Sequence, residues 1–234
     1  MTEPKTLLQL IQGQLDDFCH ERRSEFEAIS PDLVPMIDFA KSLMAGGKRF
    51  RALFAYWAWM ASLPTAEVKQ SDAQRKLSSD AIVSITTALE MFHAAALVHD
   101  DLLDQSDTRR GAPAVHKRFE TWHAEQRWAG SAERFGVAGS VLVGDLMLSW
   151  SSEIFGQALL HSPNDEITTA CREEFSRMRV EVMAGQFLDV VEENAAPSRP
   201  IDEAVARANR VMLYKTAKYS LEAPLLIGAA FAGA

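Results

Sequence analysis

Three aspartates, Asp100, Asp101 and Asp104, fall within one short stretch of the sequence. On a helix, Asp100 and Asp104 are four residues apart and Asp101 and Asp104 are three apart, so their side chains share one face. Like charges at this spacing destabilise a helix, and anions are further disfavoured near its carboxyl end. Such a conflict between local preference and expected structure is typical of a functional site. A bound divalent cation would turn the repulsion into attraction.

The aspartates offer a cation oxygen ligands only, and few of them. Mg²⁺ typically takes one or two carboxylates and completes its shell with water and phosphate, whereas zinc favours histidine and cysteine. Arg109 and Arg110 follow within about a turn and a half of helix, and guanidinium groups bind phosphate oxygens through paired hydrogen bonds. Together these residues favour a diphosphate site over a solvated acidic helix end that precedes a basic loop.

The segment Asp100-Asp101-x-x-Asp104, followed by Arg109-Arg110-Gly111-x-Pro113-x-x-His116, resembles the first aspartate-rich motif of the trans-isoprenyl diphosphate synthases. Further matches occur in the order of that family's motifs, over about residues 40 to 220. They are Gly46-Gly47-Lys48-Arg49-Phe50-Arg51, Glu90-x-x-His93, Gly144-Asp145-x-Met147-Leu148, Gly185-Gln186-x-x-Asp189 and Lys215-Thr216-Ala217. Met147 stands where leucine is usual. The resemblance is specific because several independent motifs agree in order and approximate spacing.

The resemblance implies an all-α fold, a single helical bundle around a central cavity, with residues 1–234 forming one prenyl diphosphate synthase domain. It implies a prenyltransferase that joins an allylic diphosphate (dimethylallyl, geranyl or farnesyl) to isopentenyl diphosphate. The condensation would be head to tail and would give a longer all-trans prenyl diphosphate. Homodimers are usual in the family, so the resemblance also implies a homodimer.

The same resemblance implies a role for each residue. Mg²⁺ would be bound by Asp100, Asp101 and Asp104. Isopentenyl diphosphate would be held by Lys48, Arg51, His93 and Arg110. The allylic diphosphate would be held by Arg109 together with the metal ions. The reaction centre would be lined by Lys215, Thr216 and Gln186, with Asp189 near the lysine. The catalytic set would then comprise the three aspartates, Arg109, Lys215, Thr216 and Gln186.

Product length can be argued from the helix that precedes the aspartates. An isoprene unit is about 5 Å long, close to one helical turn of about 5.4 Å. One turn back lie Ala94, Ala95 and Ala96, which leave room for a chain. Met91 and Phe92 lie one turn further back and could form a floor. We therefore expect a product longer than farnesyl diphosphate, namely geranylgeranyl diphosphate, and a longer polyprenyl product is the alternative.

Helical spacing of apolar residues runs along most of the chain, without clear strand alternation. It predicts helices over about residues 7–18, 33–44, 49–63, 81–103, 134–158 and 165–193, and a last one from about 201 onward. Residues 64–76 are polar and are predicted to form a loop, and residues 115–131 form a mixed polar stretch. With no repeat and no evident linker, the pattern favours one bundle.

Composition excludes some classes of function. The 234 residues carry a net charge of −8, which argues against a nucleic-acid binder but allows anionic substrates at local clusters of cations. Cys19 and Cys171 show no metal spacing and are expected to be reduced thiols in a cytoplasmic protein. The first residues show no apolar run of the signal-peptide kind, and no stretch is expected to approach the roughly 20 apolar residues that span a membrane.

The second aspartate-rich motif of the family is absent from the sequence. The last residues, LLIGAAFAGA, have the pattern of a helix that has only begun. We therefore expect the chain to be truncated before that motif, with C-terminal helices missing, weak substrate binding and little turnover.

Other classes of protein stay open. A non-catalytic partner subunit of a heteromeric prenyl synthase would share the motifs, although the intact aspartates and arginines argue against it. A terpene cyclase shares the aspartate-rich motif but would not need Lys48 and Arg51. A di-iron bundle is suggested by Glu90-x-x-His93 and Glu120-x-x-His123, although the other two carboxylate helices lack an evident pattern.

Overall fold

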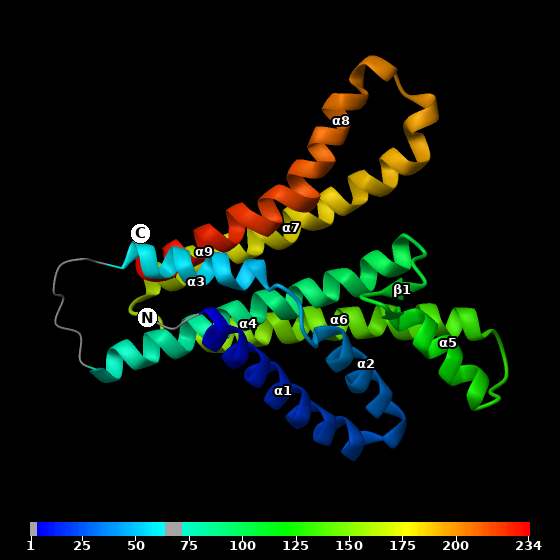
Figure 1. The fold of residues 1–234 in the computed structure, drawn as a ribbon, viewed down its shortest axis with the longest axis horizontal. Helices are drawn as coiled ribbons and strands as arrows, with labels where there is room; N and C mark the ends of the chain where they lie inside the picture. The colour runs from blue at the N-terminus through cyan, green and yellow to red at the C-terminus, as the bar shows by residue number, and fades with distance from the viewer. Residues whose placement is uncertain (1–3, 64–71) are drawn as a thin grey trace. The chain divides into compact units, whose positions relative to one another are not determined.

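The computed structural model describes residues 4–63 and 72–234, which are almost entirely helical (Figure 1). The prediction of an all-α protein is confirmed. The α-helices are α1 (Pro4–Ile29), α2 (Val34–Met44), α3 (Phe50–Ser62), α4 (Asp72–Leu103), α5 (Val115–Glu125), α6 (Ala132–Leu159), α7 (Asp165–Ala195), α8 (Ala204–Val211) and α9 (Ala223–Ala232). A π-helix, η4, covers Met212–Glu222. The short elements are η1 (Pro31–Leu33), β1 (Thr108–Arg109), β2 (Ala112–Pro113), η2 (Ala196–Ser198) and η3 (Ile201–Glu203).

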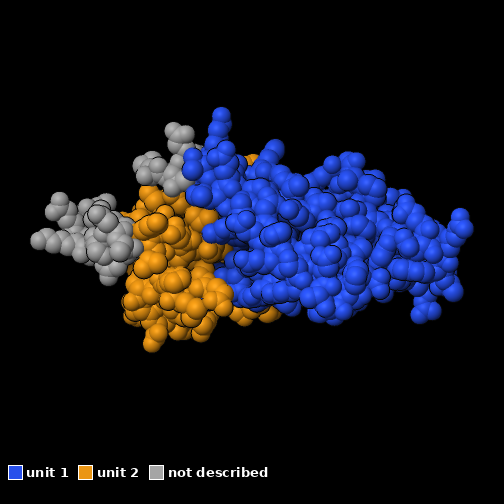
Figure 2. Space-filling view, turned by 90° about the horizontal axis from the view of Figure 1, so that it is seen from below, with its two compact units in different colours: residues 1–48, 87–156 blue, residues 49–86, 157–234 orange. Residues whose placement is uncertain are grey.

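The chain divides into two compact units, which Figure 2 shows in different colours. Unit 1 comprises Met1–Lys48 and Thr87–Gly156, and unit 2 comprises Arg49–Thr86 and Gln157–Ala234. The long helix α4 contributes its carboxyl half to unit 1 and its amino-terminal turns to unit 2. That residues 1–234 form one domain stays a prediction.

Unit 1 owes its core to apolar residues at helical spacing, as the sequence predicted. On α1, Leu7, Ile11 and Leu15 recur every four residues and are fully buried. On α4, Phe92 and Val98 are equally buried. Each such side chain stabilises the fold by about 1.5–3 kcal/mol relative to exposure.

Hydrogen bonds fix α4 against its neighbours in unit 1. The Thr87 hydroxyl of α4 donates to the side-chain oxygen of Gln14 on α1 (2.8 Å). The Ser151 hydroxyl of α6 donates to the carbonyl of Ala88 on α4 (2.8 Å). The apolar helix that ends in the aspartates is therefore held from two sides.

Helix α5 lies in the stretch that had no predicted element. Its apolar side chains Val115 and Phe119 are four residues apart and buried, and His123 continues the same face. The Phe119 ring packs edge-on against Phe39 of α2, with ring centroids 4.8 Å apart. The charged residues between them hide this periodicity in the sequence, and tertiary packing stabilises the helix.

Helix α4 begins at Asp72 rather than at residue 81. The loop prediction for residues 64–76 is therefore wrong for residues 72–76, and residues 64–71 lie outside the described residues. Residues 73–77 are Ala, Gln, Arg, Lys and Leu, all strong helix formers. Their polarity suggested a loop, but intrinsic propensity extends the helix.

Two helices within the described residues reach the length and hydropathy of a membrane span by composition alone: residues 76–103 of α4, and α6. This corrects the expectation that no stretch comes close. In α4, 78% of the apolar window is buried inside the protein, as in the core helix of a globular protein. In α6 the buried share is 39%.

In unit 2, α3 and α9 cross at very close range. A Cβ placed on Gly228 of α9 would lie 2.0 Å from the carbonyl oxygen of Ala55 on α3. Only glycine allows this approach. Helix α9 itself ends at Ala232, where Gly233 adopts a left-handed conformation (φ 86°) and its amide donates to Ala230. That the chain is truncated before the second aspartate-rich motif stays a prediction.

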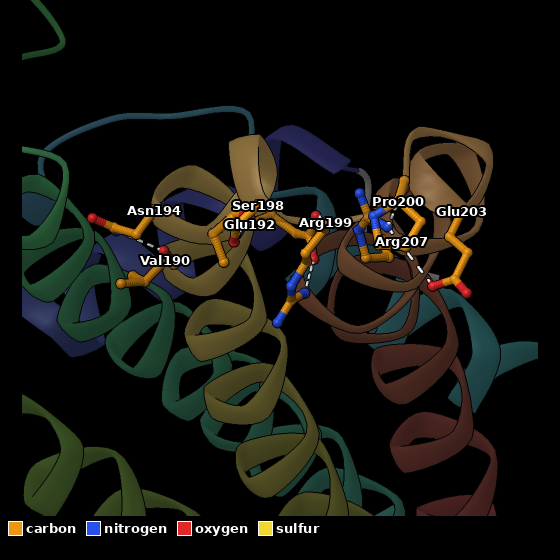
Figure 3. Close-up of polar contacts among 9 residues, drawn as sticks. Val190, Glu192, Asn194, Ser198, Arg199, Pro200, Glu203 and Arg207 are labelled. Carbon is orange, nitrogen blue, oxygen red and sulfur yellow. Dashed lines mark hydrogen bonds and ion pairs between the residues drawn. The ribbon is translucent and has the colours of Figure 1, made fainter.

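An ionic cluster closes the hairpin that α7 and α8 form in unit 2 (Figure 3). The Nε of Arg207 donates to Glu192 (2.8 Å), and its Nη1 donates to the carbonyl of Pro200 (2.9 Å). Arg199 donates to the other oxygen of Glu192. The Arg207 side chain is only 8% exposed, so its charge depends on these partners. The hydrogen bond from Arg207, followed by the charges of both arginines, lowers the pKa of Glu192.

We expect Gly228→Ala to destabilise the protein, because the added methyl group would force α3 and α9 apart. Overpacking of this kind costs about 1–3 kcal/mol, which corresponds to a melting temperature lower by about 2–12 °C. Gly13→Ala on α1 is the matched control, since its Cβ would meet nothing within 4 Å. Melting of both variants is followed by circular dichroism. A Gly228→Ala protein as stable as the control would contradict the close crossing.

The cluster at Glu192 should make stability depend on pH. A carboxyl group whose pKa is lower in the folded state adds stability above its unfolded pKa of about 4.3, and this stability is lost as pH falls. Glu192→Gln should therefore have a lower melting temperature than the wild type at pH 6. The difference between the two melting temperatures should become smaller as pH drops below about 4. Glu193→Gln, at the exposed neighbouring position, is the control. A gap that does not change with pH would show that the ion pairs contribute nothing.

Candidate active site

The three aspartates lie at the carboxyl end of α4, within unit 1. The helix ends at Leu103, but the amide of Asp104 still donates to the carbonyl of Asp100 (2.8 Å), so the helical spacing of these two carboxylates is kept. Asp101 is 1% exposed, Asp100 is half-buried and Asp104 is exposed. The carboxylates therefore lie at graded depth, from the core to solvent.

Arg109 binds the deepest of these carboxylates. Its Nε donates to Oδ1 of Asp101 at 2.7 Å, its Nη2 donates to the same oxygen, and Nη2 also reaches Oδ2 of Asp100 at 3.5 Å. The hydrogen bond to Asp101 raises the pKa of Arg109, and the charges of the aspartates add to this effect. A buried carboxylate is tolerable only when it is paired. Asp101 therefore orients the guanidinium group of Arg109. That Arg109 binds an allylic diphosphate stays a prediction.

The remaining oxygen of Asp101, Oδ2, is buried and accepts no hydrogen bond from the described residues. An unsatisfied buried acceptor costs about 1–3 kcal/mol, and more when it is charged. Across residues 4–63 and 72–234, no group of three histidine, cysteine, aspartate or glutamate side chains could hold a metal. Mg²⁺ needs only one or two carboxylates when phosphate supplies further oxygens. The residues therefore fit a Mg²⁺ ion that arrives together with a diphosphate.

A tight hairpin presents Arg110. Strands β1 and β2 pair antiparallel and leave Arg110 and Gly111 as the two turn residues. Their φ angles are 54° and 80°, as a type I′ turn requires. Glycine adopts this conformation freely, whereas it strains an arginine, and such strain is typical of functional sites. The sequence showed a basic loop here but not the hairpin.

The Arg110 side chain reaches the glycine loop that follows α2. Its Nη1 donates to the carbonyls of Leu43 (3.1 Å) and Gly46 (3.3 Å). A Cβ on Gly47, whose φ is 106°, would lie 3.1 Å from Nη2 of this arginine. Among the described residues, Arg110 has only neutral partners and forms no ion pair. Its positive charge therefore stays available to an anion.

A pocket of about 400 Å³ opens beside this hairpin in unit 1. Arg109, Arg110 and Arg118 line it together with residues of α2 and the first turn of α5. Arg118 lies 4.0 Å over the Phe39 ring, and desolvation lowers the pKa of this arginine. The pocket gives an anionic ligand access to the two arginines that follow the aspartates.

His99, which sequence reasoning passed over, joins the end of α4 to α6. Its Nε2 lies 3.4 Å from the carbonyl of Val141 and 3.6 Å from Oδ1 of Asp145. A Cβ on Gly144 would lie 2.1 Å from the same nitrogen. The signal was present in the sequence, because His99 precedes Asp100 directly and the Gly144-Asp145 motif supplies its neighbours.

The remaining predicted residues of unit 1 are Lys48 and His93. Lys48 is exposed in the loop before α3. His93 is half-buried on α4, about two turns before Asp100. Their predicted contacts with isopentenyl diphosphate stay predictions.

In unit 2, the structure brings together Lys215 of η4 and Asp189 of α7, with Nζ and Oδ2 2.6 Å apart. This contact agrees with the prediction that Asp189 lies near Lys215. Gln186, one turn earlier on α7, has a buried side-chain nitrogen, Nε2, without a hydrogen-bond partner among the described residues. Thr216 is exposed. An unpartnered buried amide costs free energy, and the predicted place of Gln186 at the reaction centre stays a prediction.

Arg51 is positioned in unit 2 by neutral groups. Its Nη2 donates to the Ser220 hydroxyl (2.7 Å), and its Cζ lies 4.3 Å from the centroid of the Tyr219 ring. Its Nε is buried and has no hydrogen-bond partner among the described residues. No described carboxylate pairs with it, so Arg51, like Arg110, keeps its charge for an anion. Sequence reasoning missed Tyr219 and Ser220, which no motif marks as contacts of Arg51.

The second Glu-x-x-His pair behind the di-iron hypothesis has another structural role. Glu120 accepts hydrogen bonds from Lys117 at 3.1 and 3.2 Å. The His123 ring lies within hydrogen-bond distance of the Ala129 carbonyl (3.2 Å) and packs against the Trp128 ring. These contacts explain the second pair without iron.

The helical fold, the aspartates at the end of α4 and the arginines with uncompensated charge define a protein of the isoprenoid synthase type. Residues 36–234 match the family model of the polyprenyl synthetases. This chain therefore belongs to the polyprenyl synthetase family, and the suspected relationship to trans-isoprenyl diphosphate synthases is confirmed.

Three similar proteins illustrate the relationship. A chloroplastic geranylgeranyl pyrophosphate synthase 11 of Arabidopsis thaliana is 30% identical over 196 residues, which cover 82% of this chain and 45% of the relative. Heptaprenyl diphosphate synthase component 2 of Geobacillus stearothermophilus is 32% identical over 130 residues, which cover 53% of this chain and 37% of the relative. A geranylgeranyl pyrophosphate synthase structure from Corynebacterium glutamicum, complexed with isoprenyl diphosphate and magnesium, matches with a TM-score of 0.84 and 31% identity. It covers 97% of this chain and 60% of that protein. The chain thus spans less than half the length of these two curated relatives.

We expect Mg²⁺ and diphosphate to bind together. Inorganic diphosphate with Mg²⁺ should raise the melting temperature, because a ligand that binds only the folded state stabilises it, whereas Mg²⁺ alone should not. Asp101→Asn should lose this stabilisation, and Asp107→Asn, an exposed carboxylate nearby, should keep it. Calorimetric scans compare the wild type with Mg²⁺ alone, the wild type with Mg²⁺ and diphosphate, and each variant with Mg²⁺ and diphosphate. Equal stabilisation by Mg²⁺ alone would contradict the inferred dependence on diphosphate.

Proposed function

We propose that this protein condenses an allylic diphosphate with isopentenyl diphosphate, head to tail, to make a longer all-trans prenyl diphosphate. The observation that carries the proposal is the state of Asp101. One oxygen of this buried carboxylate orients Arg109, and the other has no partner among the described residues. A metal-bound diphosphate would satisfy the free oxygen and add charge for the arginines to bind.

The residues of unit 1 would act on the diphosphate groups. Asp100, Asp101 and Asp104 would hold Mg²⁺, which when bound neutralises charge on the diphosphate. Arg109 would bind the allylic diphosphate and stabilise negative charge as that group leaves. Arg110 would bind isopentenyl diphosphate with Lys48 and His93, and its hairpin turn fixes its direction before substrate arrives.

Residues of unit 2 would also act on substrate. Arg51, held by Tyr219 and Ser220, would bind isopentenyl diphosphate through its uncompensated guanidinium. Lys215 and Thr216 would line the reaction centre, with Gln186 beside the reacting chain. The Asp189 carboxylate holds the Lys215 ammonium in one direction. Water must be excluded from an allylic cation, which requires an apolar surround.

The proposed product is geranylgeranyl diphosphate. On α4, Ala95 is fully buried, and so are Met91 and Phe92 one turn earlier. Small side chains next to the aspartates and bulky ones behind them support a tunnel of limited depth. The family relationship does not choose the length, since the relatives include both geranylgeranyl and heptaprenyl synthases. A cytoplasmic location, expected from the two cysteines, and a homodimer, expected from the resemblance, belong to the same proposal.

A second candidate is that the chain works only with another subunit. The heptaprenyl relative is named as component 2 of its enzyme, which favours this possibility. The carboxylates and arginines of unit 1 are present, so such a complex would draw its diphosphate site from this chain. Activity of the protein alone distinguishes the two candidates.

The test is to incubate the 234-residue protein with Mg²⁺, labelled isopentenyl diphosphate and each allylic primer, and to identify the prenyl alcohols after phosphatase treatment. We expect products longer than the primer, ending at geranylgeranyl and formed slowly, since the sequence lacks the second aspartate-rich motif of the family. If neither substrate binds or reacts, even with Mg²⁺, the proposed function is wrong.

Ala95→Phe should shorten the product, because its ring would fill the space one turn before the aspartates. Ala88→Phe is the matched control, since Ala88 lies two turns earlier on the same face of α4, behind Met91 and Phe92. It should leave product length unchanged. Both alanines are fully buried, so melting curves must first show that each variant folds. An unchanged product from Ala95→Phe would refute the tunnel.

A further inference from the structure

The backbones of α7 and η4 meet at Gly185. A Cβ placed on this glycine would lie 2.3 Å from the backbone nitrogen and 2.8 Å from the Cα of Lys215, and 2.6 Å from the carbonyl carbon of Tyr214. All three are backbone atoms, so no side-chain rotation could relieve the overlap. The two helices therefore approach closely only because residue 185 has no side chain.

Two ion pairs lie on either side of this crossing. One turn before Gly185, Glu181 binds Lys218 at 2.8 Å. One turn after it, Asp189 binds Lys215 at 2.6 Å. Both carboxylates belong to α7 and both lysines to η4. The distance between the two backbones at Gly185 thus determines how far the Lys215 and Lys218 side chains must extend to reach their carboxylates.

The helix that carries Lys215 is itself unusual. Met212–Glu222 form a π-helix, and the amide that follows it, on Ala223, donates to the carbonyl five residues back, on Lys218. π-Helical segments are rare and occur frequently at functional sites, because they shift the direction of side chains relative to an α-helix. Here the π-helix lies against the glycine, so the local backbone and the crossing together determine the direction of Lys215.

We propose that Gly185 is a positioning residue for Lys215: it lets the η4 backbone rest directly on α7, which places the Lys215 ammonium on Asp189. This inference rests on the proposed function, in which Lys215 lines the reaction centre. An ordinary contact with a Cβ is at least 3.4 Å, so a side chain at residue 185 would push the Lys215 backbone away by about 1 Å. A displacement of that size can cost about 10²-fold in rate.

Zero-length carbodiimide coupling, read by mass spectrometry, tests the geometry without any assay of activity. Wild-type protein should give an isopeptide bond between Lys215 and Asp189. The Lys117–Glu120 pair of α5, in unit 1, is an internal reference because its nitrogen and oxygen are 3.1 Å apart. In Gly185→Ala the Lys215–Asp189 product should fall relative to the reference. The proposal is overturned if wild type lacks this product or if the variant retains it in full.

Kinetics then test the consequence for the reaction. Gly185→Ala should lower kcat by about 10²-fold while the KM for isopentenyl diphosphate changes less, since Lys48, His93 and Arg110, which are proposed to bind it, lie in unit 1. Gly156→Ala on α6 is the matched control, because its Cβ would meet nothing within 4 Å. Loss of the cross-link with unchanged kcat would overturn the positioning role.

A second variant decides the matter if Gly185→Ala does not fold. Asp189→Asn keeps the crossing but removes the charge that holds Lys215, so kcat should fall and KM should again change little. Wild-type kcat in Asp189→Asn would overturn the proposal. If wild-type protein itself has no prenyltransferase activity, the proposed function fails, and the cross-link still decides whether Gly185 places Lys215.

Discussion

The structure depends on a buried negative charge at the end of an apolar helix. Asp101 lies where the helix dipole and two further carboxylates all disfavour an anion, and Arg109 compensates one of its oxygens only. The apolar face of α4 supplies the free energy that holds this arrangement, because its large side chains are fully buried. The fold therefore maintains a locally unfavourable charge, which the proposed cation and its phosphate would neutralise.

Four cations of the chain illustrate two kinds of environment. Lys218 and Arg207 are bound by carboxylates, which holds pairs of helices together. Arg110 and Arg51 are held by carbonyls, a hydroxyl and an aromatic ring, so their orientation is fixed while their charge is not neutralised. This explains how a chain with a net charge of −8 can favour anionic ligands.

Periodicity was enough to predict most helices and the all-α fold, because buried apolar positions such as Leu7 and Ile11 follow the helical repeat. It failed where polarity and structure disagree. Charged residues hide the periodicity of α5, and polarity predicts a loop at the first turns of α4, although these turns consist of strong helix formers. Within the candidate site, the aspartates and the two arginines that follow them could be predicted from residue types and spacing. The partners of Arg51 could not be foreseen, because Tyr219 and Ser220 are far away in sequence.

The glycines of the motifs carry information that a chemical interpretation of the sequence overlooks. Gly47 leaves room for the Arg110 guanidinium, Gly144 for the His99 ring and Gly185 for the backbone of Lys215. In each case the group that fills the space belongs to, or directly adjoins, a residue expected to act on substrate. These motifs therefore specify how closely helices and loops may approach, and that approach determines where the charged side chains point.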